Sequence, residues 1–455
     1  MLDRPVSMHS ATRLDPVVSP LLGQVFFRPW WDALGVPLVT GMYFPLSRAW
    51  AAAAAADGDV ERFASSVGLP ADSARLGGRV RALAPLARRY ARAEEIWQDA
   101  FFDAGVPSAE LGPIARRRDR NAFRFMMARR SFIPWLRRLP AVHWDIAGVD
   151  RVWAGRGAEA RGERPAYPAP PYPDVAVSAA IAKDDTRQYW LRYPSPVLAD
   201  QAWAHVYEPA AASASTTMIF LHGIAVDGDM WPEPGDTFGK LLERNIRVIR
   251  PTGPWHGRRM TRGYYGGEPI IGHGMEGMLA AFQAWLAEVA VLIRWARERG
   301  SRTVVLSGVS LGSLTSQMVA TAAHDWPAEM RPDALFLVAT SGSLMKVALD
   351  GSLARALDVP RRLAAAGWTP ETMAPFLPLL EPHGPAAVDP RRIVMVLGKA
   401  DTLTPYAEGS ALARRWKVPE GNVFIRHQGH FSVALGLLCD PRPIDRLLAI
   451  VAEAG

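Results

Sequence analysis

The chain has 455 residues, of which 49% are hydrophobic and 21% are charged. This is an ordinary globular composition, which excludes wholesale disorder, collagen and coiled coil, and the length predicts two domains or one large domain with an appendage. Because Cys439 is the only cysteine, neither an internal disulfide framework nor a Cys-based zinc or iron–sulfur site is expected, and a buried core must stabilise the fold.

The net charge of +7 comes almost entirely from arginine. Only five of the 52 basic residues are lysine. A dedicated nucleic-acid surface more often mixes Lys and Arg in a stripe with aromatic residues. The arginine excess, together with abundant Ala and Pro, instead indicates a biased codon supply. We therefore expect no nucleic-acid partner.

Membrane association is not favoured by the sequence. No apolar segment follows the first five residues, so no secretory signal is expected. No run reaches the ~20 apolar residues of a membrane span. The closest, residues 30–56, is broken by two prolines and two charges, and we interpret it as a packed helix. Residues 116–138 carry nine Arg among aromatic side chains. Contact of either segment with a membrane surface is the less favoured alternative to a cytoplasmic protein.

A proline-rich stretch divides the chain. Residues 154–174 read AGRGAEARGERPAYPAPPYPD, and their five prolines prevent a helix or a central strand from running through. We predict an N-terminal helical domain at residues 1–153, this stretch as a linker, and a second domain at residues 175–455. Apolar residues between 86 and 104 recur at spacings of three and four, which is typical of a helix.

Short apolar runs alternate with helical segments after the linker. The runs at 189–193 and 202–207 are expected to form an opening hairpin. Further strands are predicted at 218–221, 246–249, 304–306, 334–338, 393–397 and 423–426, with helices at 275–299 and 313–323 among them. Buried strands separated by helices predict an α/β fold with a mostly parallel, doubly wound sheet.

A nucleophile motif follows the run at 304–306. The sequence Gly308-Val309-Ser310-Leu311-Gly312 is a G-x-S-x-G pattern in its required setting, between a strand and a helix. The sharp turn holds the serine at strained backbone angles, and its neighbours must be small because other chain segments pass close by. We predict Ser310 as a nucleophile; a tightly packed turn without catalytic function is the alternative.

A serine nucleophile needs a base and an acid that orients the base. In this architecture the chain order is Ser, acid, His. Asp401 follows the run at 393–397, at the strand end where open parallel sheets build their sites. His430 follows the run at 423–426, on a loop that contains Gly429. We predict Ser310, Asp401 and His430 as a triad, with His427 as the alternative base.

Two backbone N–H groups are predicted to form an oxyanion hole. Leu311 is the residue after the nucleophile, which usually supplies one donor. Ile224 is the candidate for the second, because Gly223 permits a turn that aims its N–H inward. His222 beside it is expected to be structural.

Together, four motifs resemble the α/β-hydrolase superfamily over residues 176–455. They are His222-Gly223, the segment 308–312, Gly398-Lys399-Ala400-Asp401 and Gly429-His430. The N-terminal helical domain is predicted from its helical spacing alone. The resemblance implies that this domain is followed by an α/β-hydrolase doubly wound, mostly parallel sheet with a helical cap insertion, here residues 341–391. It does not extend to residues 1–160, and it does not identify a substrate, because the fold hosts many reactions.

The segment Pro254-Trp255-His256-Gly257-Arg258-Arg259 is similar to a Pro-x-x-Gly-x-Arg segment in a poorly characterised branch of that superfamily. Arg258 and Arg259 are candidates for binding a substrate carboxylate. An ion pair that holds the following loop is the alternative, and we favour it. Apolar residues of the cap insertion are candidates for an acyl pocket or for an ordinary helix core.

These observations predict a serine hydrolase that cleaves a carboxylic ester or related acyl compound, with no cofactor and no metal. The expected partner is a small-molecule acyl substrate, while the oligomeric state is left open. An acyltransferase that uses the same triad is one alternative. A non-catalytic binding protein with the hydrolase fold is another, although binding alone does not need the complete set of Ser, Asp and His.

Overall fold

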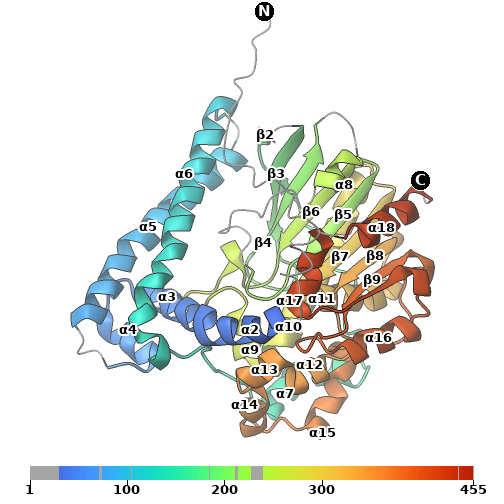
Figure 1. Cartoon of the computed structure of the whole chain (residues 1–455). Coiled ribbons are helices and arrows are strands. Elements are labelled where there is room, and N and C mark those ends of the chain that lie inside the picture. The colour runs from blue at the N-terminus through green and yellow to red at the C-terminus, as the bar shows by residue number, and fades with distance from the viewer. Residues whose placement is uncertain are drawn as a thin grey trace, which may run out of the picture.

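The computed structural model describes residues 30–70, 74–103, 105–183, 185–210, 214–226, 239–438 and 440–453. The N-terminal segment expected to lack a secretory signal lies outside these residues, as does Cys439. A mixed sheet with flanking helices forms one side of the molecule, and a group of N-terminal helices stands beside it (Figure 1).

One ten-stranded sheet organises the second half of the chain. Its order is β1-β3-β4-β6-β5-β7-β8-β9-β10, with β2 paired to β3. The strands are β1 Ala176–Val177, β2 Ile181–Lys183, β3 Thr186–Pro194, β4 Gln201–Pro209, β5 Thr216–Leu221, β6 Ile246–Thr252, β7 Thr303–Val309, β8 Ala334–Val338, β9 Ile393–Gly398 and β10 Val423–Arg426. The opening hairpin β3–β4 is antiparallel, and β4 also pairs antiparallel with β6. The remaining strands, in the sheet order β6-β5-β7-β8-β9-β10, pair parallel with one another. The predicted α/β-hydrolase sheet is confirmed.

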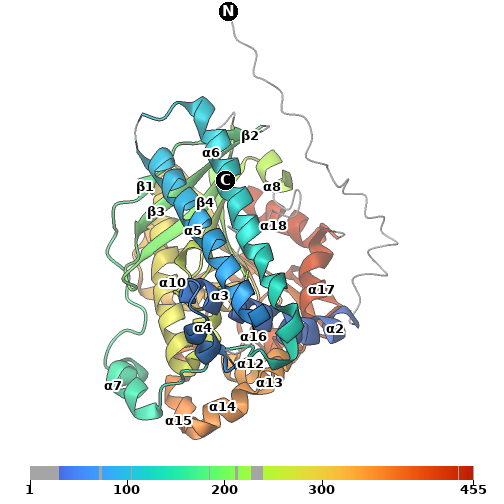
Figure 2. The same cartoon turned by 90° about the vertical axis from the view of Figure 1, so that its left-hand side faces the viewer.

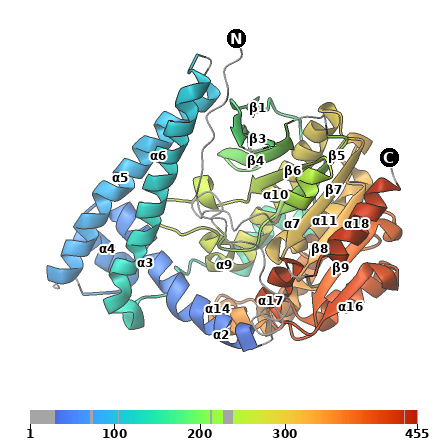
Figure 3. The same ribbon diagram turned by 45° about the horizontal axis from the view of Figure 1, so that its top comes forward.

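Helices cover both faces of this sheet, because its buried strands alternate side chains between two cores. In β7, Val304 and Leu306 join the core under α10 Gly274–Glu298 and α11 Leu311–Ala322, while Val305 joins the opposite core. That second core is closed by α8 Gly239–Glu243, α17 His430–Leu435 and α18 Arg442–Ala452. Figure 3 shows the helices on either side of the twisted sheet. The chain leaves β5 toward β6 and returns to β7 on the other side of β5, which creates a switch point at their carboxyl ends.

Helix α10 is the central core helix. Among the described residues it is the one helix long and apolar enough to cross a membrane, and 78% of its most apolar window is buried inside the protein. The expectation that residues 30–56 come closest to a membrane span is therefore wrong. The apolar character of α10 has a structural explanation, since Trp285 and its neighbours fill the core beneath the sheet.

The N-terminal region is helical, as predicted. Its elements are α2 Trp30–Leu38, a π-helical turn η1 Val39–Tyr43, α3 Phe44–Ala56, α4 Val60–Val67, α5 Ala74–Phe102, α6 Ser108–Met127, a 3₁₀ segment η2 Ala128–Arg138 and α7 Val149–Ala160. The expected single helix over residues 30–56 is interrupted by η1. Pro45, which lacks an N–H, follows this turn and removes one regular helical bond.

The long helices α5 and α6 lie against the β3–β4 edge of the sheet (Figure 2). Trp97 and Phe101 of α5 pack on Trp190 and Trp203, with ring centroids of Trp97 and Trp190 4.9 Å apart. The arginine-rich segment is a packed helix: Arg118 is buried and its Nε lies 2.7 Å from Glu94 of α5.

Helix α7 extends into the stretch expected to be a linker and ends at Ala160. The reason is that the prolines that prevent a helix begin only at Pro165. From residue 161 to 175 the chain has no helix or strand, but Tyr167 is buried and its carbonyl accepts a hydrogen bond from Trp326 Nε1 (2.9 Å). This stretch therefore packs on the second half of the chain, and the division into domains stays a prediction.

Between β8 and β9 the chain forms the expected helical insertion. Its helices are α12 Leu344–Asp350, α13 Ser352–Ala356, α14 Val359–Ala365, α15 Pro370–Met373 and the 3₁₀ segment η6 Ala374–Leu379. They lie next to α7 at the bottom of Figure 1. Leu344, Met373, Phe376 and Leu379 are buried in the main core, so these four contribute to an ordinary helix core.

Candidate active site

The turn between β7 and α11 has the geometry of a nucleophile elbow. Ser310 has φ 56° and ψ −120°, a strained conformation for a residue with a side chain. A Cβ on Gly308 would lie 2.6 Å from the Ser313 nitrogen, and one on Gly312 would lie 2.8 Å from the His222 carbonyl. Ser313 ties the turn to β8, because its Oγ accepts a hydrogen bond from the Val338 N–H (2.9 Å). The small residues around Ser310 are thus required by close chain packing.

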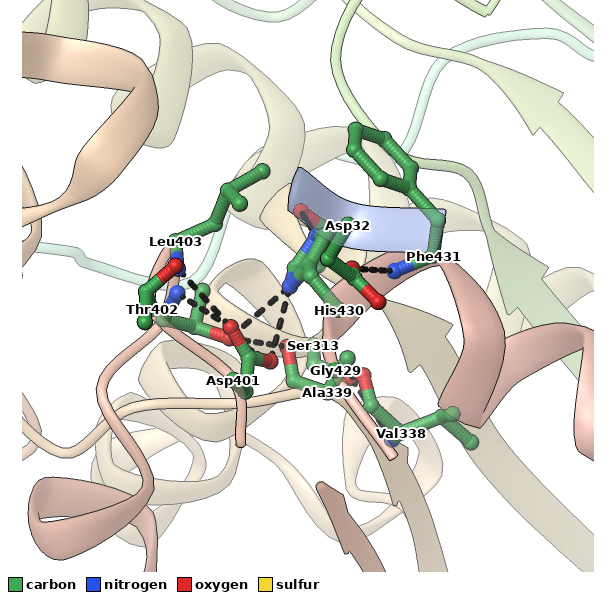
Figure 4. A network of polar contacts seen from close by, with 12 residues as sticks. Asp32, Ser313, Val338, Ala339, Asp401, Thr402, Leu403, Gly429, His430 and Phe431 are labelled. Carbon is green, nitrogen blue, oxygen red and sulfur yellow. Dashed lines mark hydrogen bonds and ion pairs between the residues drawn. The ribbon is translucent and has the colours of Figure 1, made fainter. Parts of the chain in front are cut away.

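The three predicted triad residues meet at the carboxyl ends of their strands. Ser310 Oγ lies 2.9 Å from His430 Nε2. His430 Nδ1 lies 2.8 Å from Asp401 Oδ2 (Figure 4). The alternative base, His427, is exposed. The order serine, imidazole, carboxylate lets the imidazole accept the serine proton at Nε2 while Nδ1–H donates to the carboxylate.

The Asp401 carboxylate is fixed by its own turn. Oδ1 accepts hydrogen bonds from the N–H groups of Leu403 and Thr404, both at 2.9 Å, and Oδ2 accepts from Thr404 Oγ1 at 2.7 Å. Thr404 Oγ1 also lies 3.1 Å from His430 Nδ1. These donors fix the carboxylate and hold its second oxygen toward the imidazole.

His430 is buried, and two carboxylates act on it. Burial lowers the pKa of His430, but the charge of Asp401, its hydrogen bond and the charge of Asp32 outweigh burial and raise the pKa above its usual value. A base with a raised pKa accepts a proton more readily, and the imidazolium formed during proton transfer is stabilised.

The predicted oxyanion loop lies beside the nucleophile. A Cβ on Gly223 would be 3.5 Å from Ser310 Cβ, so the loop after β5 passes directly over the elbow. Leu311 is the first residue of α11 and is buried. The two predicted donors, Ile224 and Leu311, therefore belong to segments that flank Ser310. Their role stays a prediction.

Two histidines hold this loop to the loop after β6. His222 Nε2 accepts a hydrogen bond from the Gly253 N–H (3.0 Å), and His256 Nε2 accepts one from the Ala225 N–H (3.1 Å). His256 is fully buried, and burial followed by the charge of His222 keeps its pKa well below the usual range. Its Nδ1 therefore carries the proton and donates to the Pro254 carbonyl (2.9 Å).

Arg258 and Arg259 lie in ion pairs. Arg258 Nε is 2.6 Å from Glu94 Oε1, and its guanidinium lies over the rings of Trp97 and Trp203. Arg259 pairs with both oxygens of Glu288, at 2.7 and 2.8 Å, and with Asp200. Both arginine side chains are buried. These contacts favour the structural alternative over a substrate clamp.

Three contributors to the site were missed by the sequence reasoning. Thr404 lies in the same loop as Asp401, and His256 lies in the segment considered only for its arginines, so local motifs contained both. No local sequence pattern indicated a role for Asp32, because its contact with Phe431 spans 399 positions of the chain.

The family model for the α/β hydrolase family matches residues 218–449, and the chain belongs to this family. No curated protein matches the sequence significantly.

Solved structures of several enzymes are similar to the chain. Acetyl xylan esterase 1 from Thermoanaerobacterium is 14% identical with a TM-score of 0.44, over 66% of this chain and 95% of that protein. Brefeldin A esterase, a bacterial protein, is 16% identical with a TM-score of 0.39, over 69% and 88%. An acylaminoacyl peptidase from Pyrococcus horikoshii is 11% identical with a TM-score of 0.39, over 62% and 47%.

Proposed function

We propose that the protein is a serine hydrolase that cleaves a carboxylic ester or related small acyl compound. The observation that carries the proposal is the continuous chain from Ser310 Oγ through the His430 ring to Asp401, with contacts of 2.9 and 2.8 Å. Membership of a hydrolase family supports it as well.

In the proposed reaction Ser310 Oγ attacks the acyl carbon while its proton moves to His430 Nε2. Asp401 holds the imidazolium, and the N–H groups of Ile224 and Leu311 stabilise the oxyanion. The leaving alcohol or thiol takes the proton from His430 when its bond to the acyl carbon breaks. Water, deprotonated by His430, then attacks the acyl carbon. The acid leaves as the bond from the acyl carbon to Ser310 Oγ breaks, and His430 returns the proton to Oγ.

The test is a chain-length series of p-nitrophenyl esters and matched thioesters, with Ser310→Ala as the control for background hydrolysis. Turnover that depends on Ser310, together with labelling of Ser310 by a fluorophosphonate probe, would support the proposal. Labelling of Ser310 without ester or thioester turnover would indicate that the substrate is an amide or a peptide. Product analysis with an added alcohol distinguishes hydrolysis from acyl transfer. A folded protein that neither labels nor turns over would favour the binding-protein alternative.

A further inference from the structure

The turn that carries His430 contacts an acidic residue of the N-terminal helices. Asp32 of α2 is 5% exposed, and its Oδ1 accepts a hydrogen bond from the Phe431 N–H at 2.7 Å. Its Oδ2 accepts one from Ser432 Oγ at 3.0 Å, and Ser432 Oγ in turn accepts from the Gly429 N–H at 2.9 Å. Figure 4 shows Asp32 next to this turn, on the opposite side of His430 from Asp401.

This arrangement is a helix cap supplied by another part of the chain. Helix α17 begins at His430, and the capping position before it is Gly429, which has no side chain. A capping Asp or Ser normally accepts the N–H of the second or third helical residue, and Asp32 accepts that of the second, Phe431. A Cβ on Gly429 would collide with the Asp32 carboxylate. Asp32 therefore occupies the place of the missing capping side chain.

We propose that Asp32 is a positioning residue for His430, so that the N-terminal helices complete the active site of the hydrolase domain. The inference rests on the proposed function, because it assigns Asp32 a part in that reaction. Asp32 acts by fixing the first turn of α17, on which the imidazole is mounted, and by placing a second negative charge near the imidazolium. A small displacement of a catalytic group costs on the order of 10²-fold in rate.

A second contact of the same region supports this assignment. Tyr43 of η1 donates a hydrogen bond from its hydroxyl to the Ala225 carbonyl (3.2 Å), in the predicted oxyanion loop. Phe431 packs so closely on α2 that a Cβ on Gly35 would lie 2.7 Å from its ring. The N-terminal helices therefore touch both the base loop and the oxyanion loop.

The charge of Asp32 gives the proposal a distinctive pH signature. The acidic groups that act on His430 are Asp401 from the β9 loop and Asp32 from α2, and both raise its pKa, while burial lowers it. Removing the charge of Asp32 lowers the pKa of His430. Undocking of the N-terminal helices would remove this charge as well, but it would also expose the imidazole to water. Because burial is the largest effect on the pKa of His430 and the charge of Asp32 is the smallest, the net change on undocking would be upward. The sign of the change separates positioning within a docked structure from loss of docking.

The experiment compares Asp32→Asn and Asp32→Ala with wild type in the full chain. Asn keeps the acceptor for the Phe431 N–H and removes the charge, whereas Ala removes both. The His430 pKa is measured by NMR titration of ¹⁵N-histidine-labelled protein, with the resonance assigned by its loss in His430→Ala. The matched control is Arg262→Gln, which removes a hydrogen bond from the hydrolase domain to the Ala55 carbonyl of α3, away from His430.

We expect Asp32→Asn to lower the pKa of His430 and to move the acid limb of kcat/KM for a p-nitrophenyl ester to lower pH. Asp32→Ala should lower kcat about 10- to 100-fold with little change in KM. Arg262→Gln should change neither. An unchanged or raised pKa of His430 in Asp32→Asn would overturn the proposal. A loss of activity in the Asp32 variants that is fully explained by a smaller fraction of folded protein would overturn it as well. The NMR titration needs no turnover. An inactive wild type would therefore count against the proposed ester reaction, and the titration would still decide the role of Asp32.

Discussion

The Nε2 atom of His256 accepts a hydrogen bond from the Ala225 N–H at 3.1 Å, one residue after the predicted oxyanion donor Ile224. A second hydrogen bond joins the same two loops in the opposite direction. His222, on the loop that contains Ala225, accepts it from the N–H of Gly253, on the loop that contains His256. Ala225 has a positive φ of 59°, a conformation that needs support from its surroundings. The two histidines together thus fix the shape of the loop over Ser310.

His256→Phe should therefore lower both stability and activity. The substitution leaves the Ala225 N–H without its acceptor, at a cost of about 1–3 kcal/mol. If the Ile224 N–H then moves out of line, kcat should fall on the order of 10²-fold. Denaturant unfolding and ester kinetics measure the two effects. The control is His427→Phe at an exposed position. A variant with unchanged kcat would show that Ile224 does not depend on this contact.

Substitutions in the triad should have graded effects. Ser310→Ala should abolish turnover without unfolding the protein. Asp401→Asn should lower kcat on the order of 10⁴-fold, because the correct tautomer of His430 is lost. His430→Ala should be nearly inactive and His427→Ala nearly unaffected. Equal losses in the two histidine variants, or near-full activity of Asp401→Asn, would contradict the assignment.

The arginine pair should matter for stability and not for substrate choice. Arg259→Leu leaves Glu288, which is 1% exposed, without its charged partner, and removing one partner of a buried pair costs about 3–5 kcal/mol. Arg258→Leu should cost less, because Glu94 keeps its contact with Arg118. Thermal unfolding measures both. On a matched pair of acidic and neutral esters, KM should change equally. A selective rise for the acidic ester would restore the clamp hypothesis.

Glu268 should make the protein less stable as the pH rises toward neutrality. Its carboxyl is fully buried, and burial raises its pKa from 4.5 to about 7 despite the charge of Arg48. The folded state therefore holds a proton that the unfolded state releases, so stability is lost between pH 4.5 and about 7. At about 1.4 kcal/mol per pKa unit the loss is on the order of 3 kcal/mol. Urea unfolding of wild type and Glu268→Gln should show this slope only in wild type. Parallel pH profiles would contradict the prediction.

A chain that begins at Val175 should be poorly soluble and nearly inactive. It lacks Asp32 and Tyr43, and it exposes Trp190 and Trp203, which Trp97 covers in the full chain. Light scattering, circular dichroism and ester kinetics test this. A stable monomer with unchanged kinetics would show that the N-terminal helices form an independent module.

Eight of the ten described strands were predictable because strand patterns and the turn around Ser310 are local, whereas the short edge strands β1 and β2 were missed. β8 and β10 begin and end where the apolar runs do, and Asp401 and His430 follow their strands within a few residues. Their meeting was predictable because the carboxyl ends of parallel strands share one edge. Contacts between distant segments were not predictable. The pairs Asp32–Phe431 and Glu94–Arg258 join positions 399 and 164 residues apart, with no periodicity linking them.

The collision between a side chain at position 429 and Asp32 means that the two positions compete for one volume. A residue with a side chain at position 429 would therefore displace Asp32 or move the first turn of α17. A hydrolase domain of this kind without the N-terminal helices would be released from that restriction. It could carry Ser, Asp or Asn there and cap the histidine helix from within. In this chain the absence of a side chain at position 429 and the support of the histidine helix by α2 therefore go together.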